Sequence, residues 1–206
     1  MKNLQKIVLV FALAFCAIAG DSMTSKSKIT VAKETIYVVY SSSFSPDMAM
    51  KMRKEIEQFY QVKTKTLPPV SLPKKTMTAI EGRYQANRIL DWMKEKYRNK
   101  NAKVILLTNA DICTDRNLNG KVLRNYRIFG LGTQPGNFCV VTISRFGNKK
   151  VEKKLAYVVL HELGHNYGLE HCTTLHCMMK DAQGKGANIE NEPKQFCKKC
   201  RNLLRK

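Results

Sequence analysis

The stretch HELGHNYGLEHC, residues 161–172, contains three of the four histidines in a chain of 206 residues. The fourth, His176, lies just downstream, and no histidine precedes residue 161. Neutral imidazole is a common metal ligand, and histidines gathered in one short stretch can reach a shared ion. We therefore take this stretch as the candidate site, and treat His176 as a bystander.

The segment VEKKLAYVVLHELGH, residues 151–165, predicts one continuous helix. His161 and His165 are four residues apart in it, so their side chains share one face, about 5.4 Å apart along the axis. Gly168 is the expected end of this helix, because glycine tolerates the left-handed conformation that turns the chain. A turn at that point can bring His171 back as a third ligand.

Three neutral imidazoles suit Zn²⁺ and leave a fourth position for water, whose pKa zinc lowers to about 7. Glu162 follows His161 directly, so its side chain points about 100° away around the helix and can reach that water. We predict that Glu162 is a general base that later hands the proton to a leaving amine. The pattern therefore predicts amide hydrolysis. A non-catalytic zinc site and a zinc amidohydrolase with a non-peptide substrate are the alternatives.

Four cysteines follow in two pairs. Cys172 and Cys177 have the spacing C-x4-C, and Cys197 and Cys200 have the spacing C-x2-C. Paired thiolates at such spacings are typical of a closed tetrahedral zinc site, which would stabilise a small lobe with little hydrophobic core. Disulfides are the alternative in an exported protein.

The pattern H-E-x-x-H-x-x-G-x-x-H followed by a methionine turn resembles that of the metzincin zinc peptidases. The continuation HCTTLHCMM…CKKC is similar to the archaemetzincin branch, whose pattern is H-C-x4-C-x-M-x17-C-x-x-C. Every spacing from His161 to Cys200 matches this pattern, which covers about a fifth of the chain.

The resemblance implies a zinc metallopeptidase with two Zn²⁺ ions per chain, one catalytic and one structural. Glu162 would be the catalytic base, and Met179, rather than the adjacent Met178, would form the hydrophobic floor beneath the catalytic ion. The implied ligands of the catalytic ion are His161, His165 and His171. The implied ligands of the structural ion are Cys172, Cys177, Cys197 and Cys200.

The rest of the chain predicts an α/β (α+β) fold with a mixed sheet. Strands are expected at residues 35–42, 62–66, 102–110 and 138–146, and helices at residues 46–60 and 82–98. Ser45 is the expected cap of the first helix. A loop is expected over residues 111–137, except for a short edge strand in RIFGLG, residues 127–132. In metzincins such an edge strand pairs with extended substrate through backbone hydrogen bonds.

The predicted organisation is a single metzincin-like catalytic domain, residues 20–206. Its N-terminal lobe, about residues 30–168, contains the mixed sheet and the active-site helix. Its C-terminal lobe, about residues 169–206, is irregular, and the histidines lie where the lobes meet. Cys113 and Cys139 lie in the N-terminal lobe as free thiols or a disulfide. We expect a monomer.

The first nineteen residues predict a signal peptide. Lys2 and Lys6 precede the apolar residues 7–18, and Ala19 ends a small-residue cleavage motif. We therefore expect an exported protein, periplasmic or secreted. A membrane-anchored lipoprotein, with the lipid on Cys16, is the alternative. No other stretch is long and apolar enough to span a bilayer.

The formal net charge is +20, from 36 Lys and Arg residues against 16 Asp and Glu residues. Such a chain adheres to polyanions. Because the basic residues are scattered, we expect a solvated surface and no dedicated nucleic-acid site. The expected partner is a peptide or protein substrate. A non-catalytic, zinc-stabilised binding protein for an acidic partner is the alternative to an enzyme.

Overall fold

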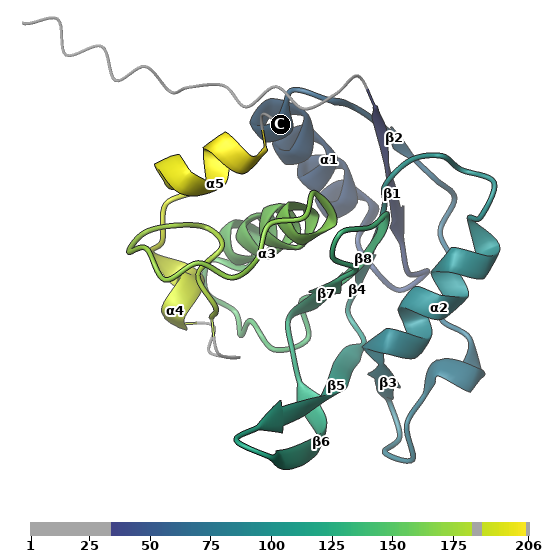
Figure 1. The fold of residues 1–206 in the computed structure, drawn as a ribbon. Coiled ribbons are helices and arrows are strands. Elements are labelled where there is room, and N and C mark those ends of the chain that lie inside the picture. The colour runs from purple at the N-terminus through teal and green to yellow at the C-terminus, as the bar shows by residue number, and fades with distance from the viewer. Residues whose placement is uncertain (1–33, 183–186, 205–206) are drawn as a thin grey trace, which may run out of the picture.

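The structure is a computed structural model that describes residues 34–182 and 187–204. The predicted signal peptide, residues 1–19, lies outside the described residues. Figure 1 shows the elements, whose bounds are β1 Thr35–Tyr40, α1 Pro46–Tyr60, β2 Lys63–Thr66, η1 Lys74–Thr76, β3 Arg83–Gln85, α2 Ala86–Lys96, β4 Val104–Thr108, β5 Asp111–Leu118, β6 Lys121–Arg127, β7 Gly130–Gly132, β8 Phe138–Thr142, α3 Val151–Asn166, α4 Ala187–Glu190 and α5 Lys198–Leu203.

Five strands form the main sheet in the order β2-β1-β4-β8-β7. The first four are parallel to their neighbours, and β7 runs antiparallel to β8 at one edge. Every residue of β4 is buried, as expected for a central strand covered on both faces. The predicted mixed α/β class is confirmed.

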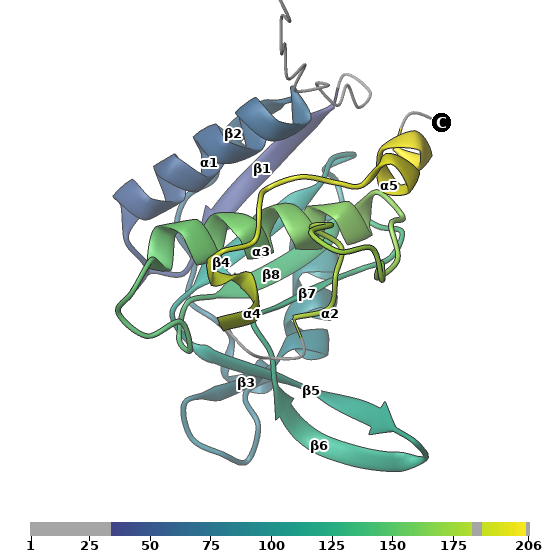
Figure 2. The ribbon, with the colours of Figure 1, turned by 90° about the vertical axis from the view of Figure 1, so that its left-hand side faces the viewer.

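Helices cover both faces of this sheet (Figures 1 and 2). α1 and α3 pack on one face and α2 on the other, which divides the apolar side chains into two clusters. Val38 belongs to the first cluster and Val39 to the second, because successive strand residues point to opposite faces. The first cluster also contains Phe196 and Leu204, so the C-terminal segment packs onto the same core as α3.

The capping residue predicted from the sequence begins the first helix, α1. The hydroxyl of Ser45 accepts a hydrogen bond of 3.3 Å from the backbone N–H of Met48, which caps α1 as predicted.

α3 is buried at every residue from Lys154 to Asn166. A helix that is buried all round lies inside a protein rather than on its surface, and Figure 2 shows α3 between the sheet and the C-terminal segment.

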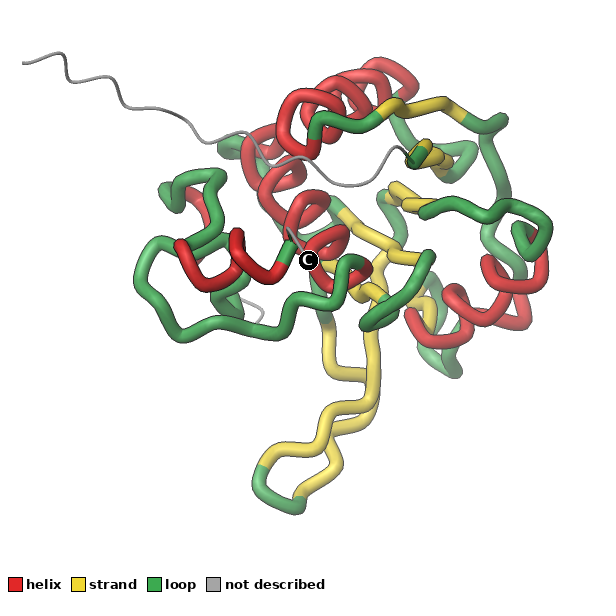
Figure 3. Tube along the Cα trace, turned by 45° about the horizontal axis from the view of Figure 1, so that its top comes forward, coloured by secondary structure: helices red, strands yellow, loops and turns green. Residues whose placement is uncertain are grey.

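The prediction of a loop over residues 111–137 is wrong. β5 and β6 form an antiparallel hairpin, which joins β3 in a second sheet and projects from the body of the molecule (Figure 3). Asn119 and Gly120 connect the two strands with φ angles of 52° and 81°. Positive φ at both central residues is typical of the type I′ turn that Asn-Gly favours in hairpins.

The predicted helix over residues 82–98 is too long. Arg83–Gln85 form β3, which pairs with β5, so α2 begins only at Ala86. The strand predicted at residues 62–66 and the edge strand within RIFGLG are confirmed as β2 and β7, although Arg127 belongs to β6. Among the described residues, no helix combines the length and apolar character needed to cross a membrane.

Candidate metal centres and cleft

The structure brings together the three histidines near the C-terminal end of α3. The Nε2 atoms of His161 and His165 are 3.1 Å apart. One nitrogen of His171 lies within 4.8 Å of a nitrogen on each of the other two rings. Gly168 makes this possible, because its φ of 87° turns the chain after α3 while its N–H donates to the carbonyl of His165 at 2.8 Å.

Backbone carbonyls orient the two imidazoles on α3. The Nδ1 of His161 donates to the carbonyl of Met178, and the Nδ1 of His165 to the carbonyl of Leu169, each at 2.7 Å. Because a carbonyl oxygen can only accept, both protons are on Nδ1 and both Nε2 atoms present a lone pair. Burial lowers the pKa of His161 to about 3 and also lowers the pKa of His165, so the rings are neutral.

This donor set fits zinc. Two Nε2 lone pairs that face each other at 3.1 Å repel unless a cation lies between them. Zinc–nitrogen bonds of about 2.0–2.1 Å in a tetrahedron place the nitrogens about 3.3 Å apart, close to this separation. His171, which is exposed, offers a third imidazole. Three protein ligands would leave one position of a tetrahedral zinc ion for water.

Glu162 is buried beside the histidines, with its side chain against the edge strand β7. The backbone N–H of Gly132 donates to its carboxylate. A Cβ at Gly130 would lie 2.6 Å from Oε1 of Glu162, and a Cβ at Gly132 would lie 2.8 Å from its carbonyl oxygen. The glycines of β7 are thus needed for α3 to approach this strand. Burial raises the pKa of Glu162 to about 8, and a dication nearby would oppose that shift.

The two adjacent methionines support the site in different ways. Met178 contributes its backbone carbonyl, which holds the ring of His161. Met179 contributes its side chain, which packs against Gly164. This glycine lies between the two histidines in the sequence of α3. A Cβ at Gly164 would lie 2.6 Å from the Sδ atom of Met179. Both methionines are fully buried, and the thioether of Met179 lies against the helix that presents the imidazoles.

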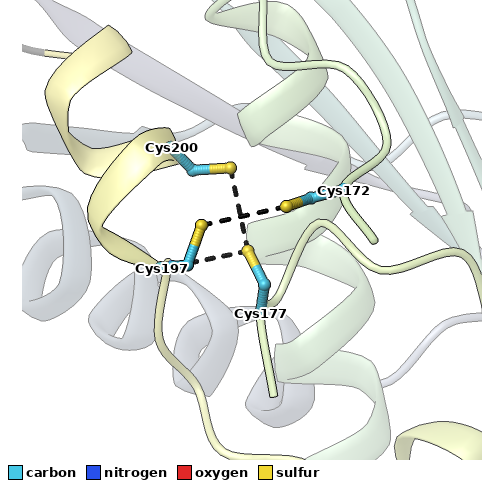
Figure 4. Close-up of side chains that lie close together, drawn as sticks. All are labelled: Cys172, Cys177, Cys197 and Cys200. Atoms are coloured by element: carbon cyan, nitrogen blue, oxygen red, sulfur yellow. Dashed lines mark hydrogen bonds between the residues drawn. The ribbon is translucent and has the colours of Figure 1, made fainter. Parts of the chain in front are cut away.

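The structure also brings the four paired cysteines into one cluster, on the C-terminal side of α3 (Figure 4). The Sγ atoms of Cys172 and Cys197 are 3.8 Å apart, and those of Cys177 and Cys200 are 3.7 Å apart. Zinc–sulfur bonds of about 2.3 Å in a tetrahedron place the sulfurs about 3.8 Å apart, whereas a disulfide bond is about 2.05 Å long. All four are free thiols in a geometry that fits zinc.

The environments of these thiols differ. Burial would by itself raise the pKa of Cys197, but the backbone N–H of Cys200, the hydroxyl of Thr174 and neighbouring thiols donate to its sulfur and lower the pKa to about 6. Burial raises the pKa of Cys200. The thiolate, which is the form that binds metal, is therefore more favoured at Cys197 than at Cys200. Cys113 and Cys139 are also free thiols, and both are buried.

A family model described as peptidase family M54 matches residues 42–206. The chain belongs to peptidase family M54. This assignment confirms the resemblance to archaemetzincins, and it supports a zinc-dependent peptidase.

Similar proteins agree with the M54 assignment. The archaemetzincin of Methanopyrus kandleri is 29% identical over 138 residues, which cover 66% of this chain and 73% of that protein. The archaemetzincin of Saccharolobus islandicus is 29% identical over 126 residues. These residues cover 57% of this chain and 63% of that protein, which is less than two thirds of its length.

Solved structures share the fold of this M54 chain. The crystal structure of the Methanopyrus kandleri archaemetzincin has a TM-score of 0.67 at 23% identity, and covers 84% of this chain and 94% of that one. The archaemetzincin of Archaeoglobus fulgidus, crystallised with malonate, has a TM-score of 0.68 at 20% identity, over 82% of this chain and 99% of that one.

A cleft of about 500 Å³ lies over the histidines of the M54 chain. Its walls come from three parts of the fold: α3 and β7, the segment after Met179, and the β5–β6 hairpin. The hairpin contributes Thr114, Arg116 and Tyr126, and Arg116 is bound to Asp181 on the facing segment at 3.0 Å. The hairpin was expected to be a loop, so its part in the cleft was not anticipated.

The sequence also gave no indication of three polar side chains that support the M54 site. The hydroxyl of Tyr157, one turn before His161, donates to the carbonyl of Met178 at 3.1 Å. The amide of Asn166 donates to the carbonyls of Thr133 and Phe138, which ties the end of α3 to the loop between β7 and β8. Lys103 donates to the carbonyl of Asn166 at 3.3 Å. Only the position of Tyr157, four residues before His161, could have indicated a role.

Proposed function

We propose that this M54 chain is a zinc-dependent peptidase that hydrolyses peptide bonds with Glu162 as general base. The observation that carries the proposal is the pair of neutral imidazoles whose Nε2 lone pairs face each other at 3.1 Å beside a buried carboxylate. His161, His165 and His171 would hold the catalytic ion. Family membership supports the zinc dependence and the peptidase class.

When bound, zinc supplies a Lewis acid that polarises the scissile carbonyl and acidifies a water molecule. Glu162 takes the proton of the attacking water and delivers it to the leaving nitrogen. The N–H of Gly132 holds the carboxylate in one orientation. Burial opposes its ionisation, which makes Glu162 a more effective proton carrier near neutral pH than an exposed carboxylate.

The edge strand β7 would hold an extended substrate. One side of β7 pairs with β8, and its other side has no partner strand among the described residues. An extended peptide can add to such an edge through backbone hydrogen bonds. Gly130 and Gly132 lie against Glu162, so a substrate on this edge runs past the base and the three imidazoles.

The four-cysteine cluster would hold a second, structural Zn²⁺. Its sulfur separations of 3.7 and 3.8 Å support this assignment. Cys172 and Cys177 lie in the loop after α3, and Cys197 and Cys200 lie at the start of α5. The ion would therefore join two segments that share little regular structure.

The test measures zinc per chain and turnover of a mixture of synthetic peptides by the full chain. The wild type should bind two zinc ions and cleave peptides. Glu162→Gln should keep both ions and lose about 10²–10⁴-fold in kcat/KM, because only the proton transfer is removed. Glu152→Gln, an exposed carboxylate in the first turn of the same helix, is the matched control and should keep full activity.

Full activity of Glu162→Gln would overturn the role of Glu162 as the base. No peptide cleavage by the zinc-loaded wild type would leave the alternative of a non-catalytic, zinc-stabilised binding protein for an acidic partner. In that case the net charge of +20 predicts binding of acidic ligands that weakens steeply with added salt.

We also propose that residues 1–19 are an export signal, on the pattern of two lysines, an apolar stretch and Ala19. Expression with a bacterial secretion system and mass determination of the secreted chain test this. A mature chain that begins at Gly20 supports the proposal. A lipid-modified chain that begins at Cys16 supports the lipoprotein alternative, and an uncleaved chain contradicts both.

A further inference from the structure

The β5–β6 hairpin is the one long feature of the described fold that the hydrophobic core does not explain. It spans residues 111–127 and projects from the body of the molecule (Figures 1 and 3). Some of its residues line the cleft. Only Ile112 and Cys113, at its base, are buried. The remainder, including Leu118 and Val122, contributes nothing to either apolar cluster.

The strand register separates the hairpin into two sides. Arg116 lies opposite Leu123, and Asn117 lies opposite Val122. Residues directly opposite each other in an antiparallel pair share one side of the sheet, so Leu123 is on the side of Arg116 and Val122 is on the other.

The side that carries Arg116 is the side that faces the cleft. Thr114, Arg116 and Tyr126 all line the cleft. A register shift between Thr114 and Arg116, with Asn125 at a φ of 53°, keeps Tyr126 on this side, and the guanidinium carbon of Arg116 lies 5.4 Å from its ring centre. We call this surface the cleft-facing side; it consists of Thr114, Arg116, Leu118, Lys121, Leu123 and Tyr126.

The cleft-facing side combines apolar and basic groups. It presents the tyrosine ring and two leucines, of which Leu118 is 40% exposed, together with Arg116 and Lys121. Asp115, in the irregular part of β5, also lines the cleft. Its carboxylate accepts from the backbone N–H of Asn125 at 3.0 Å and lies 3.9 Å from the guanidinium of Arg124. Asp181 pairs with Arg116 and so fixes the hairpin beside the histidine site.

We propose that the cleft-facing side is an exosite that binds a peptide or protein substrate several residues away from the cleaved bond. It selects an extended segment that carries both apolar and acidic residues on one of its sides, at every second position, because successive side chains of an extended chain point to opposite sides. The apolar side chains pack on Leu123 and Tyr126, and the acidic ones pair with Lys121. The inference rests on the proposed peptidase function, because it assumes that the same cleft holds a substrate.

The chain connectivity gives this exosite its geometry. β6 ends at Arg127 and β7 begins at Gly130, so the hairpin continues directly from the strand that would hold the substrate. The eight residues of β5 extend about 26 Å at about 3.3 Å per residue. A peptide that fills only the cleft does not reach the end of the hairpin, whereas one that is about eight residues longer does.

The experiment compares extended substrates with a core peptide that the zinc-loaded full chain cleaves. The core is extended at either end by eight residues, either Leu-Ser-Glu-Ser repeated twice (the Leu/Glu extension), which places Leu and Glu on one side, or alternating Gly and Ser (the Gly/Ser extension). At one end, the Leu/Glu extension should raise kcat/KM about tenfold over the Gly/Ser extension, through a lower KM. Leu123→Ser should remove most of this gain.

Val122→Ser is the matched control, because it removes a neighbouring and more exposed aliphatic side chain, 55% exposed, from the opposite side. It should leave the gain unchanged. Lys121→Glu should reduce the gain for the Leu/Glu extension. Equal effects of Leu123→Ser and Val122→Ser, or no gain from extension at either end, would overturn the exosite.

Failure of the peptidase function is recognised separately. If no core peptide is cleaved by the wild type, the binding of a labelled Leu/Glu peptide to full-length Glu162→Gln is measured by fluorescence anisotropy. Addition of Leu123→Ser should then weaken binding about tenfold and addition of Val122→Ser should not. Equal affinities overturn the exosite on this readout as well.

Discussion

The histidine and cysteine centres of this chain depend on the fold in opposite ways. His161 and His165 project from a helix that is buried all round, and backbone carbonyls hold both rings. The cysteines come from a segment whose regular elements are helices of four and six residues. In the first centre the fold itself arranges the imidazoles, whereas in the second a bound metal ion would stabilise the arrangement of the chain.

The two centres are also connected. The N–H of Cys172 donates to the carbonyl of Met179 at 2.8 Å, and Cys172 directly follows His171. The carbonyl of Met178, which orients His161, lies between Cys177 and Met179 in the chain. Because of these connections, the cysteine centre should support the histidine centre, while the reverse dependence should be weak.

The largest effect is expected from Cys200→Ser. Loss of this buried sulfur should release the structural ion, lower Tm by about 10 °C or more and abolish activity, because structural zinc sites contribute much of the stability of small lobes. His171→Ala is the counterpart on the exposed side of the histidine centre, and should lose one ion with little change in Tm. Tm and metal content are measured for both variants. Equal losses of Tm in Cys200→Ser and His171→Ala would contradict the proposed difference between the two centres.

A smaller effect is expected from Gly130→Ala. The new Cβ would lie 2.6–2.9 Å from side-chain atoms of Glu162 and would displace the carboxylate. A misplacement of about 1 Å can cost about 100-fold in rate, with about 1–3 kcal/mol of stability lost to overpacking. Steady-state kinetics and urea unfolding measure both. Retention of two zinc ions is the control. An unchanged kcat/KM would show that activity does not depend on a fixed position of the Glu162 carboxylate against β7.

Gly164→Ala tests how the methionine turn supports the histidine centre. The new Cβ would lie 2.6 Å from the Sδ of Met179, so stability should fall by about 1–3 kcal/mol and zinc should bind more weakly at the histidines. Met179→Ala in the same chain removes the colliding atoms and should recover part of the loss. Additive losses in the double variant would mean that the two residues are not in contact.

Tyr157→Phe should have the smallest effect. Its hydroxyl donates to the carbonyl of Met178, which also accepts from His161, so the carbonyl keeps one partner when the hydroxyl is removed. The expected cost is about 0.5–1.5 kcal/mol of stability, with activity within a fewfold of the wild type. Thermal unfolding and kcat/KM test this. A loss of more than tenfold in activity would show that the hydrogen bond from Tyr157 is needed to hold the carbonyl of Met178, even though His161 also donates to this carbonyl.

Sequence reasoning worked where local signals and burial agree. Ser45 followed by Pro46 predicted the start of α1, and the apolar stretches around Val38 and Leu106 predicted the central strands. It failed for the β5–β6 hairpin, because strands that pack on no core show no apolar alternation. The Asn119-Gly120 turn was the one signal that could have indicated it.

The amino-acid sequence alone was enough to predict which residues gather in the two clusters, since the spacing of His161, His165 and His171 depends on helix periodicity and on one glycine turn. The four cysteines were likewise evident from spacing, which is a local property of the chain. These features need no knowledge of distant residues.

The surroundings of the two clusters depend on tertiary packing. The approach of Glu162 to Gly130, and the packing of Met179 on Gly164, join residues from different elements. The hairpin reaches the cleft because Arg116 meets Asp181 from a segment 65 residues away. Such contacts depend on how elements pack in three dimensions, and no periodicity within a single element encodes them.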